Sequence, residues 1–215
     1  MQRVNLFCGH YGSGKTNIAV NYAMHLKQQG LPVAIADLDI VNPYFRTKDS
    51  EDELKAAGID VISLPFANSS VDLPAIPSQA YALFQNKLRY AVLDIGGDDR
   101  GAYALGRFAH YILEENNFSN FYVANFCRPL TRTAEEALEV MREIESASSV
   151  PFTAIVNNSN IGEETTPELV EKSREEAEKL SKLCGLPIAM TTVDIRIADN
   201  MDSEVFPLKL QKKYW

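Results

Sequence analysis

Cysteine is scarce in this 215-residue sequence, and the three cysteines that it contains lie far apart. Cys8, Cys127 and Cys184 form no Cys-x-x-Cys pair. This spacing argues against a disulfide framework, a zinc site and an iron–sulfur site that bridges two subunits. We therefore expect apolar thiols in a reducing cytosol, and we predict a cytoplasmic protein.

The sequence also lacks long apolar runs and a secretion signal. No run approaches the length of a membrane-spanning helix, and Val4–Cys8 is too short for the apolar part of a signal peptide. The run FPLKLQKKYW mixes lysines with apolar residues, but Leu208 and Leu210 alternate as they would in a strand or a packed tail. Membrane attachment is therefore not expected.

An excess of basic residues is absent as well. The formal net charge is -8 at pH 7, which argues against binding nucleic acid through bulk electrostatics. Hydrophobic residues make up 46% of the chain and charged residues 23%, which is ordinary for a globular protein with a full core. Because the length suits one α/β unit, we predict that residues 1–215 form a single domain.

Short β-like runs alternate with longer helix-like runs along the sequence. Most β-like runs are continuously apolar, which is typical of parallel strands covered by helices on both faces. The predicted strands are Val4–Cys8, Val33–Asp37, Val61–Leu64, Tyr90–Ile95, Phe121–Phe126, Thr153–Val156 and Ile188–Thr192. The alternation predicts a three-layer α/β fold, doubly wound around a mostly parallel sheet.

Two helices can be placed by their periodicity and end signals. Between Thr131 and Ala147 the apolar residues share one helical face. These residues are Ala134, Ala137, Leu138, Met141 and Ile144. A second helix is expected to have Thr166 as its N-cap and Pro167 at its first position, and to end before Gly185.

The stretch FCGHYGSGKTNIAV contains the phosphate-loop (Walker A) motif Gly-x-x-x-x-Gly-Lys-Thr between an apolar run and a helix-like run. Such a loop wraps a phosphate with backbone N–H groups, and glycines permit the positive φ and close approach that this requires. Lys15 is expected to contact the β- and γ-phosphates as a binding and catalytic residue, and the Thr16 hydroxyl is expected to ligate Mg²⁺. A helix from Lys15 to about Gln29 directs its positive end at the phosphates. The predicted nucleotide-binding residues here are Gly9, Gly12, Ser13, Gly14, Lys15, Thr16 and Asn17.

Two further segments place carboxylates after predicted strands. In YAVLDIGGDD, Asp94 ends an apolar strand, where a carboxylate can reach Mg²⁺ through water. Gly97 completes an Asp-x-x-Gly pattern whose glycine N–H can sense the γ-phosphate. In VAIADLDIVNPYF, Asp37 and Asp39 can orient the attacking water or hold the water shell of the metal, with an Asx-type turn as the alternative. We assign Thr16, Asp37 and Asp94 to the metal site.

The motifs GHYGSGKT, ADLDIVNP, VLDIGG and IVNNSN occur in this order and span nearly the whole chain. With them the chain resembles the MinD/ParA class of P-loop ATPases, which is related to the CobQ/CobB and dethiobiotin-synthetase nucleotide-binding domains. The resemblance implies that Asp39 positions the hydrolytic water as a catalytic residue, that Asp37 is its neighbour on the metal side, and that Asp94 is the Walker B acid. It also implies that Asn157 hydrogen-bonds adenine, and that the segment Thr192–Asp194 closes over the base.

The motif expected to recognise the base and the residue at position 10 both differ from those of other P-loop families. ATP is favoured over GTP, because a guanine-reading Asn-Lys-x-Asp is absent and the sequence instead reads Asn157-Asn158-Ser159-Asn160. His10 stands where the MinD/ParA ATPases have a signature lysine that reaches across a nucleotide-sandwich dimer. A neutral imidazole is shorter and usually uncharged at pH 7. A non-lysine here also resembles the nickel metallochaperone GTPases, whose guanine motif is missing. Either hydrolysis in a homodimer is altered, or the protein acts without that dimer as a slow switch or a phosphotransferase.

Three functions fit these motifs. The first, which we favour, is a Mg²⁺-dependent ATPase in which ATP orders residues 42–53 and 96–107 for a partner protein and hydrolysis releases them. The second is a small-molecule kinase or ATP-dependent ligase of the dethiobiotin-synthetase/CobQ kind. Its acceptor pocket would be lined by Arg46, Arg100, Arg107 and Arg128. The third is a module that holds nucleotide without turnover, and the intact Asp39 and Asp94 argue against it.

Substitution of Asp39 tests its predicted role. Asp39→Ala is expected to retain ATP binding and to lower the hydrolysis rate by about 10² or more, because losing a water-positioning group has effects of that size. Phosphate release at saturating ATP measures the rate, and calorimetry measures the affinity. An unchanged rate, or a loss of affinity as large as the loss of rate, would contradict the assignment.

Overall fold

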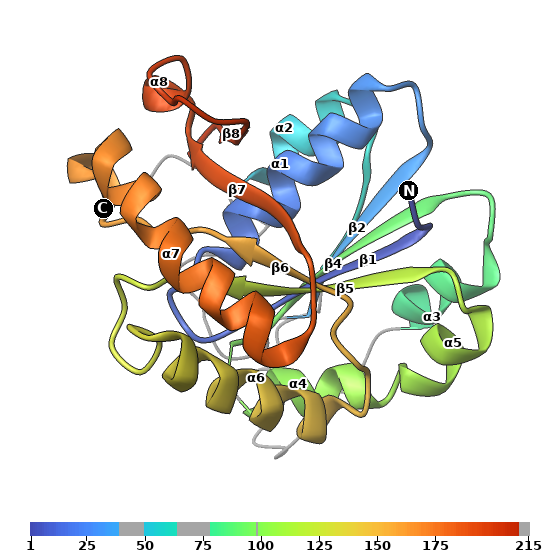
Figure 1. Cartoon of the computed structure of the whole chain (residues 1–215). Helices are drawn as coiled ribbons and strands as arrows, with labels where there is room; N and C mark the ends of the chain where they lie inside the picture. Colours follow the sequence, from blue (N-terminus) through green and yellow to red (C-terminus); the bar gives the residue numbers. More distant parts are fainter. Residues whose placement is uncertain (39–49, 64–77, 98, 211–215) are drawn as a thin grey trace, which may run out of the picture.

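A parallel sheet of eight strands forms the centre of the structure, a computed structural model that describes residues 1–38, 50–63, 78–97 and 99–210 (Figure 1). The strands are β1 (Val4–Cys8), β2 (Val33–Leu38), β3 (Asp60–Ser63), β4 (Tyr90–Ile95), β5 (Phe118–Ala124), β6 (Ala154–Asn157), β7 (Ile188–Asp194) and β8 (Phe206–Leu208). Their order is β3-β2-β4-β1-β5-β6-β7-β8, and all neighbours pair in parallel. The chain builds one side of β1 and then the other, so the predicted doubly wound fold is confirmed.

Seven of the eight strands coincide with the apolar runs of the sequence. β1 and β4 have the predicted bounds, whereas β5 begins at Phe118 rather than at Phe121. The extra residues include Asn120, a fully buried polar side chain whose Nδ2 donates to the carbonyl of Val150 at 3.1 Å. A pattern of apolar residues cannot reveal a strand position that is filled by a hydrogen-bonded amide. β8 is missed because it is short and contains Pro207, a residue that an edge strand tolerates.

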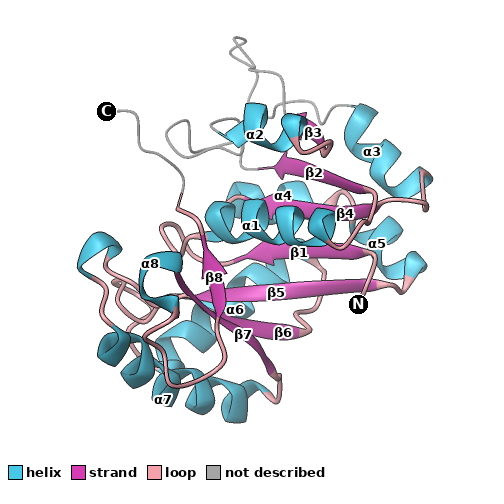
Figure 2. Ribbon diagram, turned by 90° about the horizontal axis from the view of Figure 1, so that it is seen from above, coloured by secondary structure: helices cyan, strands magenta, loops and turns pink. Residues whose placement is uncertain are grey.

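Helices cover both faces of the sheet. They are α1 (Lys15–Gln28), α2 (Glu51–Ala56), α3 (Ser78–Gln85), α4 (Asp99–Gly106), α5 (Ala109–Glu115), α6 (Ala134–Ser148), α7 (Pro167–Cys184) and α8 (Ile195–Ala198), with a short 3₁₀ helix at Gly162–Glu164. Figures 1 and 2 show α1 and α2 on one face and α4, α6 and α7 on the other. The arrangement has three layers, as the alternation of elements predicts.

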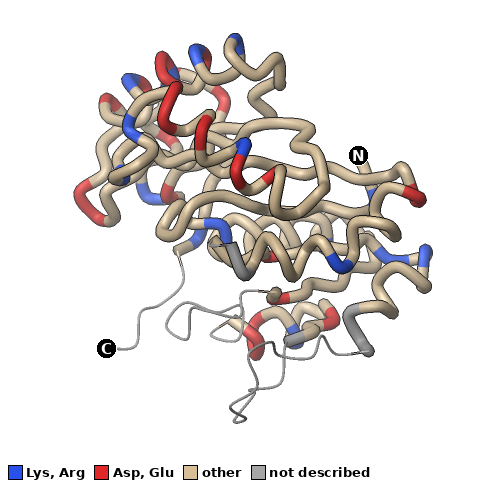
Figure 3. Tube along the Cα trace, turned by 90° about the horizontal axis from the view of Figure 1, so that it is seen from below, with Lys and Arg blue, Asp and Glu red and all other residues tan. Residues whose placement is uncertain are grey.

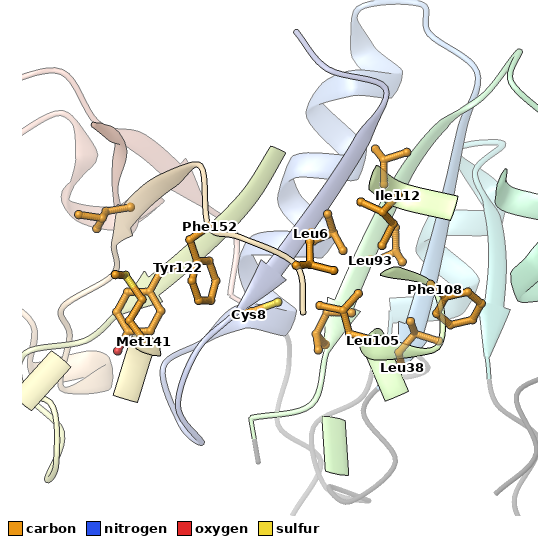
Figure 4. Packing of buried hydrophobic residues seen from close by; sticks show 14 of the residues in the cluster. Leu6, Cys8, Leu38, Leu93, Leu105, Phe108, Ile112, Tyr122, Met141 and Phe152 are labelled. Atoms are coloured by element: carbon orange, nitrogen blue, oxygen red, sulfur yellow. The ribbon is translucent and has the colours of Figure 1, made fainter. Parts of the chain in front are cut away.

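Each face of the sheet has its own apolar core, because successive strand residues point to opposite sides. On β1, Leu6 and Cys8 belong to the core beneath α3 to α7, whereas Phe7 belongs to the core beneath α1 and α2. The first core also contains Leu93 and Phe108, both fully buried (Figure 4). Burial on both faces explains why the strand sequences are continuously apolar rather than alternating.

The two helices expected from periodicity are present. On α6 the predicted apolar face is buried or packed against the first core. On α7, Thr166 is the N-cap, its side chain accepts the N–H of Leu169, and Pro167 is the first helical residue. The helix ends at Gly185, which has a φ of 76°. Local chemistry therefore sets both ends of α7.

Charged residues of both signs are interspersed over the surface (Figure 3). On α7, Arg174 Nε lies 2.9 Å from Glu171 Oε2, and Lys179 Nζ lies 2.5 Å from Glu176 Oε1. These partly exposed pairs mark the solvent side of the helix. In the described part of the chain, none of the helices is long and apolar enough to cross a membrane.

The segment after β8 lies along α1. The N–H of Lys209 donates to Asn21 Oδ1 at 2.8 Å, and Asn21 Nδ2 donates to the carbonyl of Lys209 at 3.0 Å. Lys209 Nζ lies 2.6 Å from Glu53 Oε1 of α2, and Leu208 is buried. The expected strand or packed tail is confirmed up to residue 210, and residues 211–215 lie outside the described residues.

Two tyrosines give a matched test of how the hydrogen bonding of a buried hydroxyl affects stability. The hydroxyl of Tyr122 is buried without a hydrogen-bond partner among the described residues, whereas the hydroxyl of Tyr22 donates to Asn5 Oδ1 at 3.3 Å. Tyr122→Phe is therefore expected to leave the free energy of unfolding unchanged or to raise it by up to about 1 kcal/mol. Tyr22→Phe is expected to lower it by about 1 kcal/mol. Urea unfolding measures both, and a greater loss in Tyr122→Phe than in Tyr22→Phe would contradict this account.

Candidate nucleotide-binding site

The phosphate-loop residues, Gly9 to Gly14, connect β1 to α1 at the carboxyl edge of the sheet. β1 lies between β4 and β5, and Phe7 is the register partner of Asp94 on β4 and of Phe121 on β5. All three strands run in the same direction, so the ends of β4 and β5 flank the loop. Ligands of open parallel sheets bind in this location.

Close packing accounts for the glycines of the loop. A Cβ added to Gly9 would lie 2.4 Å from the carbonyl oxygen of Val123 on β5. A Cβ added to Gly14 would lie 2.2 Å from Asn158 Nδ2, and the φ of Gly14 is 91°. Gly12 also has a positive φ, 76°. The predicted need for glycine is thus met by close approach at Gly9, by backbone conformation at Gly12, and by both at Gly14.

The side chains of the loop are arranged for a phosphate. Lys15 is 6% exposed, and its Nζ donates to the carbonyl of His10 at 3.2 Å across the loop. Ser13 is 2% exposed, and its Oγ is buried without a hydrogen-bond partner among the described residues. Thr16, in the first turn of α1, is half-buried. A buried hydroxyl without a partner is costly, so Ser13 fits an anion that accepts a hydrogen bond from it.

Two of the predicted acidic residues lie next to each other beside the loop. Asp37 on β2 and Asp94 on β4 are register partners, and they are 4% and 1% exposed. β2 continues to Leu38, one residue beyond the predicted strand. Asp39 lies outside the described residues. The structure therefore brings together two of the three carboxylates that the sequence assigns to metal and water.

Cys8 immediately precedes the loop and is buried. Burial raises the pKa of its thiol far above the usual value, while the charge of Lys15 lowers this pKa and the charge of Asp94 raises it. Its Sγ lies 3.3 Å from Asn120 Oδ1. Cys127 and Cys184 are half-buried, and all three thiols are free. Cys8 is thus a protonated core residue at the site and not a nucleophile.

Gly97 lies directly against the phosphate loop. A Cβ added to it would lie 2.6 Å from Lys15 Nζ and 2.7 Å from the backbone nitrogen of Tyr11. The same close packing continues at Gly101 in the first turn of α4, where an added Cβ would lie 2.4 Å from the carbonyl oxygen of Gly96. The Asp-x-x-Gly segment, the lysine and the loop therefore form one packed unit.

Asn157, the last residue of β6, and Asn158, which follows it, both form hydrogen bonds within the protein. Asn157 is fully buried, its Nδ2 donates to Ser173 Oγ at 2.8 Å, and its Oδ1 accepts the N–H and the hydroxyl of Ser159. Both ends of its amide are thus engaged within the protein, and binding of adenine by Asn157 stays a prediction. Asn158 instead reaches the phosphate loop, donating to the carbonyl of Ser13 at 2.6 Å and accepting from Thr192 Oγ1 at 2.6 Å. The only feature of the sequence that points to a role for Asn158 is its position in the polar run that follows a predicted strand.

Asp194 ends β7 and caps α8. Its Oδ1 accepts the N–H of Arg196 at 2.9 Å, and its Oδ2 lies 2.6 Å from Arg196 Nη2. Partial burial raises the pKa of Asp194, but the hydrogen bonds and charge of Arg196 outweigh it and hold this pKa below its usual value. A structural cap accounts for these contacts, and closure of this segment over a base stays a prediction.

The two predicted partner segments are partly described. Residues 42–49 lie outside the described residues, and α2 begins directly after them with Leu54 buried against the sheet. α4 lies in the second segment, where Leu105 is buried and Tyr103 is 62% exposed. Among the described residues, no group of three or more His, Cys, Asp or Glu side chains is arranged to hold a metal ion. A Mg²⁺ site made of the Thr16 hydroxyl, phosphate oxygens and water needs no such group.

Comparison with known proteins supports the fold. No family model and no curated protein match the sequence. The structure is similar to that of cell division protein FtsY from Thermotoga maritima, with a TM-score of 0.65 and 17% identity over 90% of this chain and 62% of that chain. It is similar to FtsY from Mycoplasma mycoides, with a TM-score of 0.62 and 18% identity over 90% and 60% of the chains. It is also similar to the signal recognition particle receptor FtsY from Elizabethkingia anophelis in complex with GDP, with a TM-score of 0.60 and 16% identity over 90% and 58%.

This chain therefore spans less than two thirds of the length of these structures. At such identities the likeness shows the fold, which is that of the P-loop nucleoside triphosphatases. It does not single out the MinD/ParA class within that fold.

Lys15 provides the most direct test of the site. Lys15→Ala is expected to lower the affinity for ATP by about 2 kcal/mol or more, because it removes a charge-assisted contact with the phosphates. Isothermal titration calorimetry measures the affinity, and circular dichroism verifies that the variant is folded. Unchanged affinity in a folded variant would refute the assignment of the phosphate loop.

Proposed function

We propose that the protein is a Mg²⁺-dependent ATPase that acts as a nucleotide-dependent switch on a partner protein, with residues 1–215 as one nucleotide-binding domain. The proposal is supported by the phosphate loop, in which the Ser13 hydroxyl and Lys15 are buried and the hydroxyl has no hydrogen-bond partner among the described residues. The P-loop fold and the position of the loop between β4 and β5 agree with it.

The observation that supports a switch function is the close packing of Gly97 against the phosphate loop. A γ-phosphate held by a P-loop lysine lies between that lysine and the N–H of the Asp-x-x-Gly glycine. Gly97 now stands so close to Lys15 Nζ and Tyr11 N that even a methyl group does not fit between them. A triphosphate therefore requires Gly97 to move away from the loop, whereas a diphosphate does not.

The packing of α4 on Gly96 would transmit this displacement to the surface of the protein. Gly101 packs on Gly96, so the first turn of α4 has no room to stay in place when Gly96 and Gly97 shift. α4 carries the exposed Tyr103, an aromatic side chain of the kind that anchors protein interfaces. We infer that the γ-phosphate alters the position of α4 and with it the surface that a partner protein reads.

The chain supplies the groups that a hydrolytic site needs around the phosphates. Thr16 would hold the metal directly, and the adjacent carboxylates of Asp37 and Asp94 would bind its water shell. Bound Mg²⁺ would neutralise charge on the β- and γ-phosphate oxygens. Lys15 must exchange the carbonyl of His10 for phosphate oxygens, which accept a stronger, charge-assisted hydrogen bond.

We propose ATP rather than GTP as the ligand, although one structural neighbour is a complex with GDP. The segment after β6 has no Asn-Lys-x-Asp, and its Asn157 and Asn158 amides bind Ser173, Ser159, Ser13 and Thr192. Residues 157–160 therefore contain no carboxylate that could pair with the guanine amino edge.

Nucleotide competition tests this preference. Labelled ATP is expected to be displaced by unlabelled ATP at a concentration about tenfold or more below that of unlabelled GTP, because a missing specific hydrogen-bonding partner costs at least that much. Fluorescence anisotropy with Mg²⁺ present measures both curves, and CTP serves as a control for binding through phosphates alone. Displacement by GTP at an equal or lower concentration would overturn the assignment of ATP while leaving the phosphate site intact.

A further inference from the structure

The loop between β5 and α6, residues 125–133, places an arginine on the phosphate loop. A Cβ added to Gly12 would lie 3.6 Å from Arg128 Nε and 3.8 Å from Arg128 Cζ. Gly12 and Arg128 are both exposed, whereas Lys15 is buried. The phosphate loop thus has a second cation beside it, at Gly12.

Hydrogen bonds hold the backbone that carries Arg128 in place. The carbonyl of Asn125 accepts the N–H of Arg128 at 3.1 Å and the hydroxyl of Thr131 at 2.8 Å. Asn125 Oδ1 accepts the N–H of Cys127 at 3.0 Å and the N–H of Asn160 at 3.3 Å. Asn125 is 1% exposed, so one buried residue sets the course of the whole turn. The side chain of Arg128 therefore starts from a defined position beside Gly12.

The guanidinium is not engaged by a carboxylate within the described residues. None of the ion pairs that these residues form includes Arg128. The charge of Arg128 also affects its neighbour in the chain. Burial raises the pKa of Cys127, and the positive charge of Arg128 opposes this rise. The Ser13 hydroxyl, next to Gly12, is buried without a hydrogen-bond partner among the described residues. It is therefore a second group that could bind an anion at this part of the loop.

The position of Gly97 indicates which phosphate of the nucleotide would lie nearest to Arg128. Gly97, the glycine that senses a γ-phosphate, packs on Tyr11. Tyr11 adjoins Gly12, so Arg128 lies at the γ-phosphate end of the loop. The ring of His10 is engaged with the loop backbone instead, because its Nδ1 lies 3.0 Å from the carbonyl oxygen of Tyr11.

We propose that Arg128 binds the γ-phosphate of a nucleoside triphosphate from within the same chain, in addition to Lys15. This inference rests on the proposed nucleotide-binding function. The planar guanidinium gives two parallel hydrogen bonds to a phosphate, whereas the ammonium of Lys15 acts as a point charge. Arg128 thereby distinguishes triphosphate from diphosphate, which Lys15 alone does less well because it also contacts the β-phosphate.

The test compares affinities for non-hydrolysable ATP and GTP analogues with those for ADP and GDP in the full chain. Arg128→Ala is expected to weaken binding of the preferred triphosphate analogue by about tenfold or more and binding of its diphosphate by less than about twofold. Arg128→Lys, which keeps the charge but loses the planar fork, should lie between wild type and Arg128→Ala. Arg132→Ala, an exposed arginine in the same loop whose backbone N–H bonds Glu136, is the matched control and should bind like wild type.

The outcomes separate this inference from the proposed function. A wild-type protein that binds neither triphosphate would refute the nucleotide site itself and the inference with it. Normal wild-type binding together with equal weakening of triphosphate and diphosphate in Arg128→Ala would overturn the role at the γ-phosphate alone. Unchanged binding of both nucleotides in Arg128→Ala would likewise overturn the role of Arg128 at the γ-phosphate.

Discussion

The site depends on backbone packing so close that side chains have no room. Gly9 touches the carbonyl of Val123, Gly14 touches the amide of Asn158, and Gly97 touches Lys15 and Tyr11. These contacts come from three different strands, β5, β6 and β4, whose ends surround the loop that follows β1. The shape of the phosphate loop is therefore set by the order of the strands in the sheet as much as by the loop's own glycines. A Cβ at Gly9 or Gly97 would displace backbone, and one at Gly14 would displace the buried amide of Asn158.

Buried amides extend this constraint away from the phosphates. Asn158 joins the carbonyl of Ser13 to the hydroxyl of Thr192 on β7, and Asn157 joins Ser159 to Ser173 on α7. These hydrogen bonds link the phosphate loop to strand β7 and the end of β6 to helix α7. Each amide has donors and acceptors matched, which is what buried polar groups require. A change in any one member thus leaves another buried group without a partner, so the segment after β6 acts as a rigid support of the loop.

The sequence predicts the parts of the fold that rest on local chemistry. Continuous apolar runs identify seven strands, and Thr166, Pro167 and Gly185 identify both ends of α7, because period, caps and turns are encoded within a few neighbouring residues. The phosphate loop is identified for the same reason. What the sequence does not reveal is which distant groups meet: Asn158 beneath Gly14 and Arg128 on Gly12 are separated from the loop by more than a hundred positions. Only the strand order brings them together.

The contact of Gly97 with the phosphate loop also determines where the energy of binding goes. Lys15 already has an acceptor in the carbonyl of His10, and Gly97 already has a packed neighbour in Tyr11. A ligand gains only the difference between its own contacts and those that it replaces. In the proposed switch, a diphosphate replaces the first contact alone, whereas a triphosphate replaces both. Part of the binding energy of the γ-phosphate would then be used to move Gly96, Gly97 and the turn of α4 packed on them, and this cost would make the position of α4 depend on the nucleotide.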